Sequence, residues 1–171
     1  MTDEKQQAVQ VLFVCMGNIC RSPMAEGVFR HRWRERAGDS NLATEIGIDS
    51  AGTHSYHVGS APDKRAQAAT TRRGVDISAL EARRVAPEDF ERFDYILAMD
   101  GDNLEYLIAE AAAENRDKIK LFLDYSVTKR GGEVPDPYYG GNMGFERVLD
   151  LIEDAPEGFI DELLKDAAPS S

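Results

Sequence analysis

Apolar residues in this chain gather in four short runs, at residues 11–14, 46–48, 95–99 and 119–123. Each run is rich in strand-forming residue types and has the length of a buried strand. Between the runs, apolar residues recur at helical spacing. Strand and helix therefore alternate, which predicts an α/β fold built from parallel βαβ units, with helices on both faces of the sheet.

The first helix is predicted from a stripe of apolar residues that follows the first strand. Ala25, Phe29, Trp33 and Ala37 are four residues apart, and Gly38 is placed to end that helix. Further helices are expected over residues 63–73, ended by Gly74, over 87–93, over 103–114, and on both sides of Pro156 near the C-terminus. Residues 124–143 are expected to form a long irregular loop, and such loops often carry function.

The helix predicted over residues 103–114 has an apolar side. We expect Leu104, Leu107, Ile108 and Ala111 to face the core there.

The segment that joins the first strand to the first helix carries the candidate chemistry. Gly17 and Asn18 tolerate unusual backbone angles, and Ser22 followed by Pro23 is a typical helix start. Such a turn points successive backbone N–H groups and the positive end of a helix dipole at one place, in front of Cys15. A thiolate is favoured in that position. The loop therefore predicts a cysteine nucleophile beside an oxyanion site.

Arg21 completes this site, because guanidinium offers a planar, two-pronged donor to a tetrahedral oxyanion. The pattern Cys15-x5-Arg21-Ser22 resembles the phosphate-binding loop of protein tyrosine phosphatases. Directly after a strand, the longer pattern Cys-x-Gly-Asn-x-Cys-Arg-Ser-Pro resembles the low-molecular-weight subfamily. Asp136-Pro-Tyr-Tyr resembles that family's general-acid loop. Residues 49–53 and the Met-Asp-x-x-Asn-Leu segment at 99–104 match its other recurring segments in the same order.

The resemblance spans about residues 9–165 and implies one phosphatase domain over residues 1–171, with strand order 2-1-3-4. It implies that Cys15 attacks phosphorus, that Arg21 grips phosphate oxygens, and that Ser22 eases the departure of the thiolate. Helix capping alone would also explain Ser22. Phosphate would be bound by the loop residues Met16, Gly17, Asn18, Ile19, Cys20 and Arg21.

Asp136 is assigned by the resemblance as general acid to the leaving phenol and then as base for water. By itself an aspartate before proline is an ordinary turn pair, so the assignment depends on the family match. The aromatic walls of a substrate pocket are expected at Tyr138 and Tyr139 and, where relatives often carry tryptophan, at Tyr56.

Asn18 and Ser50 are similar to the pair that holds this family's loop by side-chain hydrogen bonds. Arg73 stands where the family usually has a histidine in that network, so this part of the network is expected to differ. Ile19 takes the position where arginine-phosphate phosphatases of the same fold carry threonine, which favours phosphotyrosine as the substrate.

Cys20 has three interpretations: a loop-packing thiol, a reversible disulfide partner of oxidised Cys15, or a metal ligand. His31, His54 and His57 show no ligand spacing with the cysteines, so we expect neither a metal nor another cofactor. The two cysteines are too few and too close together for a secreted disulfide framework.

The composition narrows the class of protein further. With 171 residues the chain fits one domain, and its net charge of −11 disfavours nucleic acid and anionic membranes as partners. The polar first ten residues and the lack of a 20-residue apolar run predict a cytoplasmic protein without a membrane span. The expected partners are phosphotyrosine proteins, with a cognate tyrosine kinase suggested at family level, and the chain is expected to be a monomer or a weak dimer.

Two other functions use the same loop. An arsenate reductase would bind a tetrahedral anion equally well; its thioredoxin-coupled form needs downstream cysteines, which are absent after Cys20, but a form using an external thiol stays open. A non-catalytic phosphotyrosine-binding module could dispense with the acid, yet Asp136 is present.

Overall fold

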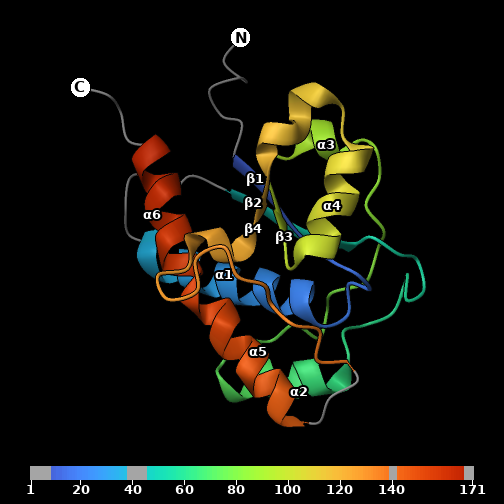
Figure 1. Cartoon of the computed structure of the whole chain (residues 1–171). Coiled ribbons are helices and arrows are strands. Elements are labelled where there is room, and N and C mark those ends of the chain that lie inside the picture. Colours follow the sequence, from blue (N-terminus) through green and yellow to red (C-terminus); the bar gives the residue numbers. More distant parts are fainter. Residues whose placement is uncertain (1–8, 38–45, 139–141, 168–171) are drawn as a thin grey trace.

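A computed structural model describes residues 9–37, 46–138 and 142–167, which fold around one parallel sheet (Figure 1). The sheet has four strands in the order β2-β1-β3-β4, as the resemblance implied. The strands are β1 (Val9–Cys15), β2 (Ile46–Gly52), β3 (Tyr95–Ala98) and β4 (Ile119–Leu121). Each neighbouring pair is parallel.

The register of the strands brings their carboxyl ends to one edge of the sheet. Cys15 pairs with Gly52 of β2, and Val14 pairs with Ala98 of β3. Ligands of open parallel sheets bind beyond this edge. The end of β1 therefore places Cys15 where a site is expected.

The helices and 3₁₀ segments alternate with the strands along the chain. They are α1 (Arg21–Ala37), α2 (Lys64–Arg72), α3 (Asp89–Arg92), α4 (Gly101–Glu110), the 3₁₀ segments η2 (Ala113–Lys118) and η3 (Phe122–Tyr125), α5 (Asn142–Asp154) and α6 (Pro156–Ala167). In the described residues, no helix is both long and apolar enough to cross a bilayer.

Alternation along β1 divides the core between the two faces of the sheet. Val11 and Phe13 belong to a buried cluster with α1, α5 and α6, and Leu12 belongs to a smaller cluster with α3 and α4. The larger face is dominated by aromatic rings. Phe29 of the predicted stripe lies 5.2 Å from the ring centroid of Phe159 in α6. Figure 1 shows these helix groups on opposite sides of the strands.

Two predictions about helices need correction. The helix expected over residues 103–114 begins at Gly101, because the Asp100 side chain accepts a hydrogen bond from Asn103 N and caps it. It ends at Glu110, where Ala111 turns to an extended conformation. Ile108 is not inward, since 38% of it is exposed. The alanines after the helix would continue it by propensity, but the chain must turn back here to enter β4.

The fourth strand is also shorter than its apolar run. It ends at Leu121, and the rest of the run forms η3. In the predicted loop over 124–143, η3 extends to Tyr125 and α5 begins at Asn142. Gly38 and residues 139–141 lie outside the described residues, as does the side chain of Ala37.

Candidate active site

The loop between β1 and α1 curls around the sulfur of Cys15. Its tight turn requires Asn18 to take a φ of 58°, the left-handed region that asparagine tolerates better than most residues. As a result the backbone N–H of Asn18 points at Cys15 Sγ, 3.3 Å away, and the Ser22 hydroxyl lies 3.0 Å from the same sulfur. Both groups can stabilise negative charge on sulfur.

A buried chain of side chains holds the turn in this shape. Asn18 Nδ2 donates to Ser22 Oγ at 2.8 Å and to Ser50 Oγ at 3.0 Å, so the predicted contact between Asn18 and Ser50 is confirmed. Because Ser22 Oγ accepts from Asn18, its own hydrogen stays available to Cys15. Asn18 Oδ1 accepts from the backbone N–H of Arg83 at 2.9 Å, which fixes the orientation of the amide.

Glu26 is the last member of this series of hydrogen-bonded side chains, and the sequence did not predict it. Ser50 Oγ donates to Glu26 Oε1 at 2.7 Å, and Arg30 Nη2 donates to Glu26 Oε2 at 3.1 Å. Burial raises the pKa of Glu26, although the bonds from Ser50 and Arg30 act in the opposite direction. The signal in the sequence was its position, since Glu26 directly follows Ala25 of the predicted apolar stripe.

Arg73 lies outside this network, in agreement with the expected departure from the family. Its guanidinium pairs with α5 instead, where it contacts Glu146 and Asp150 at 2.9 Å and Glu153 at 2.5 Å. In this chain the direct bond from Ser50 to Glu26 closes the network.

Arg21 is buried and oriented by groups from two distant loops. Its Nη1 donates to Asp100 Oδ2 at 2.5 Å and to the Val134 carbonyl at 3.0 Å, and its Nη2 lies 3.5 Å from Asp136 Oδ2. Burial alone would lower the pKa of Arg21, but negative charge at Cys15 and the bond to Asp100 raise it. Both hydrogens of Nη1 are occupied, so Nε and Nη2 remain to grip an oxyanion.

Asp136 lies at the mouth of the site, with 32% of its side chain exposed. Its Oδ1 accepts from the backbone N–H of Tyr138 at 3.0 Å, a local turn of the kind expected for this residue type. The structure thus brings Cys15, Arg21 and Asp136 to one pocket, as the family resemblance implied. The role of Asp100 was missed, although it belongs to a segment that matches the family.

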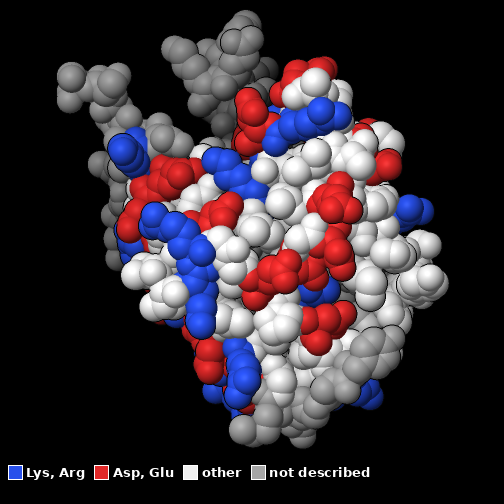
Figure 2. All heavy atoms as spheres, viewed as in Figure 1, with Lys and Arg blue, Asp and Glu red and all other residues white. Residues whose placement is uncertain are grey.

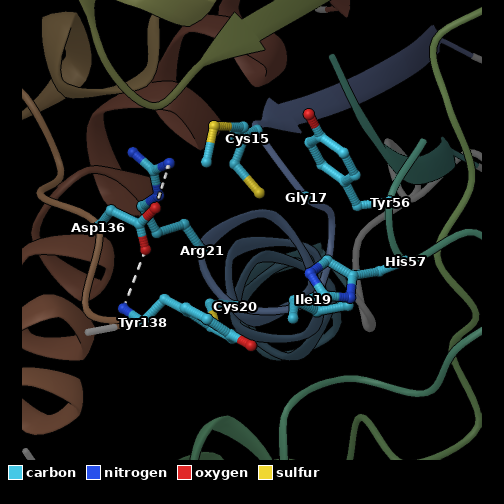
Figure 3. A pocket seen from close by; sticks show the side chains of 10 residues that line it. Cys15, Gly17, Ile19, Cys20, Arg21, Tyr56, His57, Asp136 and Tyr138 are labelled. Carbon is cyan, nitrogen blue, oxygen red and sulfur yellow. Dashed lines mark hydrogen bonds and ion pairs between the residues drawn. The ribbon is translucent and has the colours of Figure 1, made fainter. Parts of the chain in front are cut away.

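The pocket has a volume of about 120 Å³ and two aromatic sides. Figure 3 shows Tyr56 and His57 on one side of the pocket and Tyr138 and Asp136 on the other, and the ring centroids of His57 and Tyr138 lie 6.0 Å apart. Tyr56 is 80% exposed and stacks on His54 at 5.6 Å. His57 was not predicted as a lining residue. Met16, Gly17, Ile19, Cys20 and Arg21 also line the pocket, whereas Tyr139 lies outside the described residues.

Cys20 is buried in the same loop, and its environment differs from that of Cys15. Burial and the negative charge of Asp63 raise the pKa of the Cys20 thiol well above its usual value. It is therefore protonated at neutral pH. Among the described residues, no group of three or more His, Cys, Asp or Glu side chains is placed to hold a metal ion.

The surface over α4 carries acidic side chains, so an anion must be attracted by groups inside the pocket. Figure 2 shows acidic side chains gathered over α4 and just below it, and the exposed acids of α4 include Asp102 and Glu105. This acidic area over α4 (Figure 2) would repel an anionic substrate. Binding must come from the buried arginine and the amides of the loop.

Residues 10–168 match the family model of the low molecular weight phosphotyrosine protein phosphatases. The chain belongs to this family. A low molecular weight protein-tyrosine-phosphatase of Bacillus subtilis is 41% identical, with 92% of this chain and 97% of that protein covered. The human low molecular weight phosphotyrosine protein phosphatase is 42% identical, with 84% and 89% covered.

The fold agrees with this family as well. A crystal structure of a protein tyrosine phosphatase from Entamoeba histolytica superimposes with a TM-score of 0.86 at 41% identity, covering 94% of this chain and all of that one. The solved structure of the Bacillus subtilis relative gives 0.82. As a low molecular weight phosphatase, the chain carries the family's loop segments on the family's fold.

Proposed function

We propose that this protein hydrolyses phosphotyrosine in proteins through a cysteinyl-phosphate intermediate. The observation that carries the proposal is the convergence on one pocket of Cys15, with hydrogen-bond donors on its sulfur, the fixed guanidinium of Arg21, and Asp136. A nucleophile, an oxyanion clamp and a proton donor are the parts that phosphoryl transfer to sulfur needs.

The first step transfers the phosphoryl group to the enzyme. The Cys15 thiolate attacks phosphorus, so an S–P bond forms while the bond from phosphorus to the phenol oxygen breaks. Asp136 gives its proton to that oxygen, and tyrosine leaves as a neutral phenol. Nε and Nη2 of Arg21, with the loop amides, stabilise the charge on the equatorial oxygens.

The second step returns the enzyme to its starting state. Asp136, now a carboxylate, accepts a proton from water as the water oxygen attacks phosphorus. The S–P bond breaks, inorganic phosphate forms, and the sulfur leaves as a thiolate stabilised by the Ser22 hydroxyl and the Asn18 N–H. The proton count is balanced, because Asp136 regains the proton it gave.

The pocket supports phosphotyrosine over phosphoserine. Cys15 is 2% exposed, at the bottom of a hollow whose sides are Tyr138 on one hand and Tyr56 with His57 on the other. A phosphate on an aromatic ring reaches this depth while the ring contacts the walls, whereas the short serine side chain would bring the peptide backbone against them. The proposed partners are phosphotyrosine proteins, a cognate tyrosine kinase among them, and we propose that the chain acts as a monomer or weak dimer.

We place this activity in the cytoplasm, because the mechanism needs a reduced Cys15 and a second free thiol lies beside it. Cytosolic thiols are kept reduced.

Kinetics of Cys15→Ser test the proposal. Turnover of phosphotyrosine peptides should fall by about a thousandfold or more, while vanadate binding, measured by calorimetry, should persist because Arg21 and the loop amides remain. Phosphoserine and phosphoarginine peptides and arsenate serve as competing substrates. Retention of more than a small fraction of the rate by Cys15→Ser, or faster turnover of any competitor, would refute the proposal.

A further inference from the structure

Arg65, in the first turn of α2, contacts the loop that carries Asp136. Its Nη2 donates to the carbonyl of Tyr138 at 3.0 Å. The guanidinium carbon also lies 5.6 Å from the ring centroid of Tyr138 and 4.7 Å from that of Phe145 in α5. These are distances at which an arginine is attracted to an aromatic face. The side chain therefore fastens the C-terminal side of the acid loop.

The other side of Arg65 is fixed to the phosphate-binding loop. Asp63 Oδ1 accepts from Arg65 Nε at 3.0 Å, and Asp63 Oδ2 accepts from Nη2 at 3.0 Å, a two-point pair that holds the guanidinium plane. The backbone N–H of Asp63 donates to the Ile19 carbonyl at 2.8 Å. One line of contacts thus joins the phosphate loop to the acid loop, through Asp63, Arg65 and Tyr138.

Tyr138 lies between Arg65 and the acid. Its carbonyl is held by Arg65, and its N–H donates to Asp136 Oδ1, a bond drawn in Figure 3. On the other side of Asp136, the Val134 carbonyl accepts from Arg21, and the Val134 N–H donates to the carbonyl of Met99. Asp136 therefore lies between two backbone carbonyls that accept hydrogen bonds from arginines: that of Val134 from Arg21 and that of Tyr138 from Arg65.

We propose that Arg65 is a positioning residue that holds Asp136 over the phosphate-binding loop so that its proton reaches the leaving oxygen. This role rests on the proposed function. Proton donation depends on the position of the carboxyl group to within about 1 Å, so loosening one end of the loop should impair the acid before it impairs the nucleophile. Arg65 itself touches no reacting atom.

The test compares Arg65→Ala with wild type on phenyl, 4-chlorophenyl and 4-nitrophenyl phosphate. Nitrophenolate leaves without a proton, so kcat/KM on that substrate should fall only about threefold, while the loss on phenyl phosphate should be about tenfold larger. Arg72→Ala is the matched control, because it also removes an arginine from α2, one that is exposed and paired with Glu146. For Arg72→Ala, kcat/KM should equal that of wild type on all three substrates.

A double variant separates positioning from structural support. If Arg65 acts through the acid, adding Arg65→Ala to Asp136→Asn should cause no further loss that depends on the leaving group. A loss that is equal for all three substrates, no loss, or a further loss in the double variant that depends on the leaving group would each overturn the proposal. Arg65→Lys keeps one donor without the fork and should be intermediate; if Arg65→Ala does not fold, the same comparison with Arg65→Lys decides.

The series also distinguishes this proposal from the function it rests on. Equal losses from Asp136→Asn across the leaving groups would refute the acid role of Asp136 itself. A steep dependence for Asp136→Asn together with a flat one for Arg65→Ala would refute only the role of Arg65.

Discussion

Two cysteines five residues apart share one loop, yet the structure gives them different chemistry. Cys15 Sγ is met by two hydrogen-bond donors, whereas Cys20 is buried beside Asp63, which keeps it protonated. An oxidant should therefore react with Cys15 first, because thiolates are the nucleophiles. The sulfenic acid that forms can condense with the Cys20 thiol and release water.

We predict that mild peroxide inactivates the enzyme reversibly through a Cys15–Cys20 disulfide. Added thiol should restore most of the activity of the wild type but little of that of Cys20→Ser, whose sulfenic acid lacks a nearby thiol and is oxidised further. Recovery of activity and the mass of the loop peptide measure this. Equal recovery of both proteins, with no loss of two hydrogens from the wild-type peptide, would contradict it.

Glu26 makes stability depend on pH, because its carboxylate is buried. Burial raises its folded-state pKa above the ordinary value of 4.5, so the folded protein favours the protonated form. The stabilisation linked to that proton is complete below pH 4.5 and is lost as pH rises through the folded-state pKa.

Glu26→Gln removes the titration while keeping an acceptor for Ser50. We predict that the free energy of unfolding of this variant, relative to wild type, increases between pH 4 and pH 7. Urea unfolding at several pH values measures the difference, and other carboxylates cancel because both proteins share them. A difference that is constant or that falls with pH would show that Glu26 is not titrating as described.

At the scale of elements, the end of β2 is pressed against the phosphate-binding loop. A Cβ added to Gly52 would lie 2.6 Å from the carbonyl oxygen of Met16 and 3.2 Å from Asn18 N. The loop cannot retreat, because Thr53 N–H donates to the Cys15 carbonyl and His54 N–H to that of Met16. Any side chain at this position must displace the amides that face the oxyanion.

We therefore predict that Gly52→Ala lowers kcat/KM by about 10- to 100-fold. This loss should exceed any fall in the folded fraction that its melting curve indicates at the assay temperature. Gly144→Ala in α5 is the control, since among the described residues its added carbon meets Pro137 Cβ at 3.8 Å, an ordinary contact distance, and nothing nearer. Kinetics with 4-nitrophenyl phosphate and melting curves of both variants give the comparison. Unchanged activity of Gly52→Ala would mean that the loop can shift without cost.

The sequence predicted well those elements that are specified by residues next to one another in the chain. The apolar run of β1 and the residues of the turn after it located the strand and the nucleophile. The end of α4 was wrong, because Ala111 and its neighbours favour helix by propensity and are turned out of it by the return to β4. Local preference cannot show where the chain must turn.

The contacts missed at the site connect segments far apart in the chain. Asp100 lies 79 residues from Arg21, and the Val134 carbonyl lies 113 residues from it. Every residue has a backbone carbonyl, so the sequence could not have identified the contact between Arg21 and the carbonyl of Val134. His57 reaches the pocket only through the path of the chain after β2.

At the scale of the whole molecule, the chain has an excess of acidic residues although its candidate site is suited to an anion. The net charge is −11, and acidic side chains gather on the face shown in Figure 2. Long-range attraction is therefore not available to bring phosphate to the pocket. Binding depends instead on short-range contacts. The topology of the sheet makes these possible, because it brings the loop amides, the start of α1 and Arg21 to one edge.

The bonds that Asp100 and Val134 make to Arg21 also have an entropic consequence. A free arginine side chain has rotational freedom worth about 2 kcal/mol. Here that freedom is lost when the chain folds, because Nη1 is held at two points before any anion arrives. An oxyanion meets a donor pair whose conformation is already fixed, so little conformational entropy remains to be lost on binding.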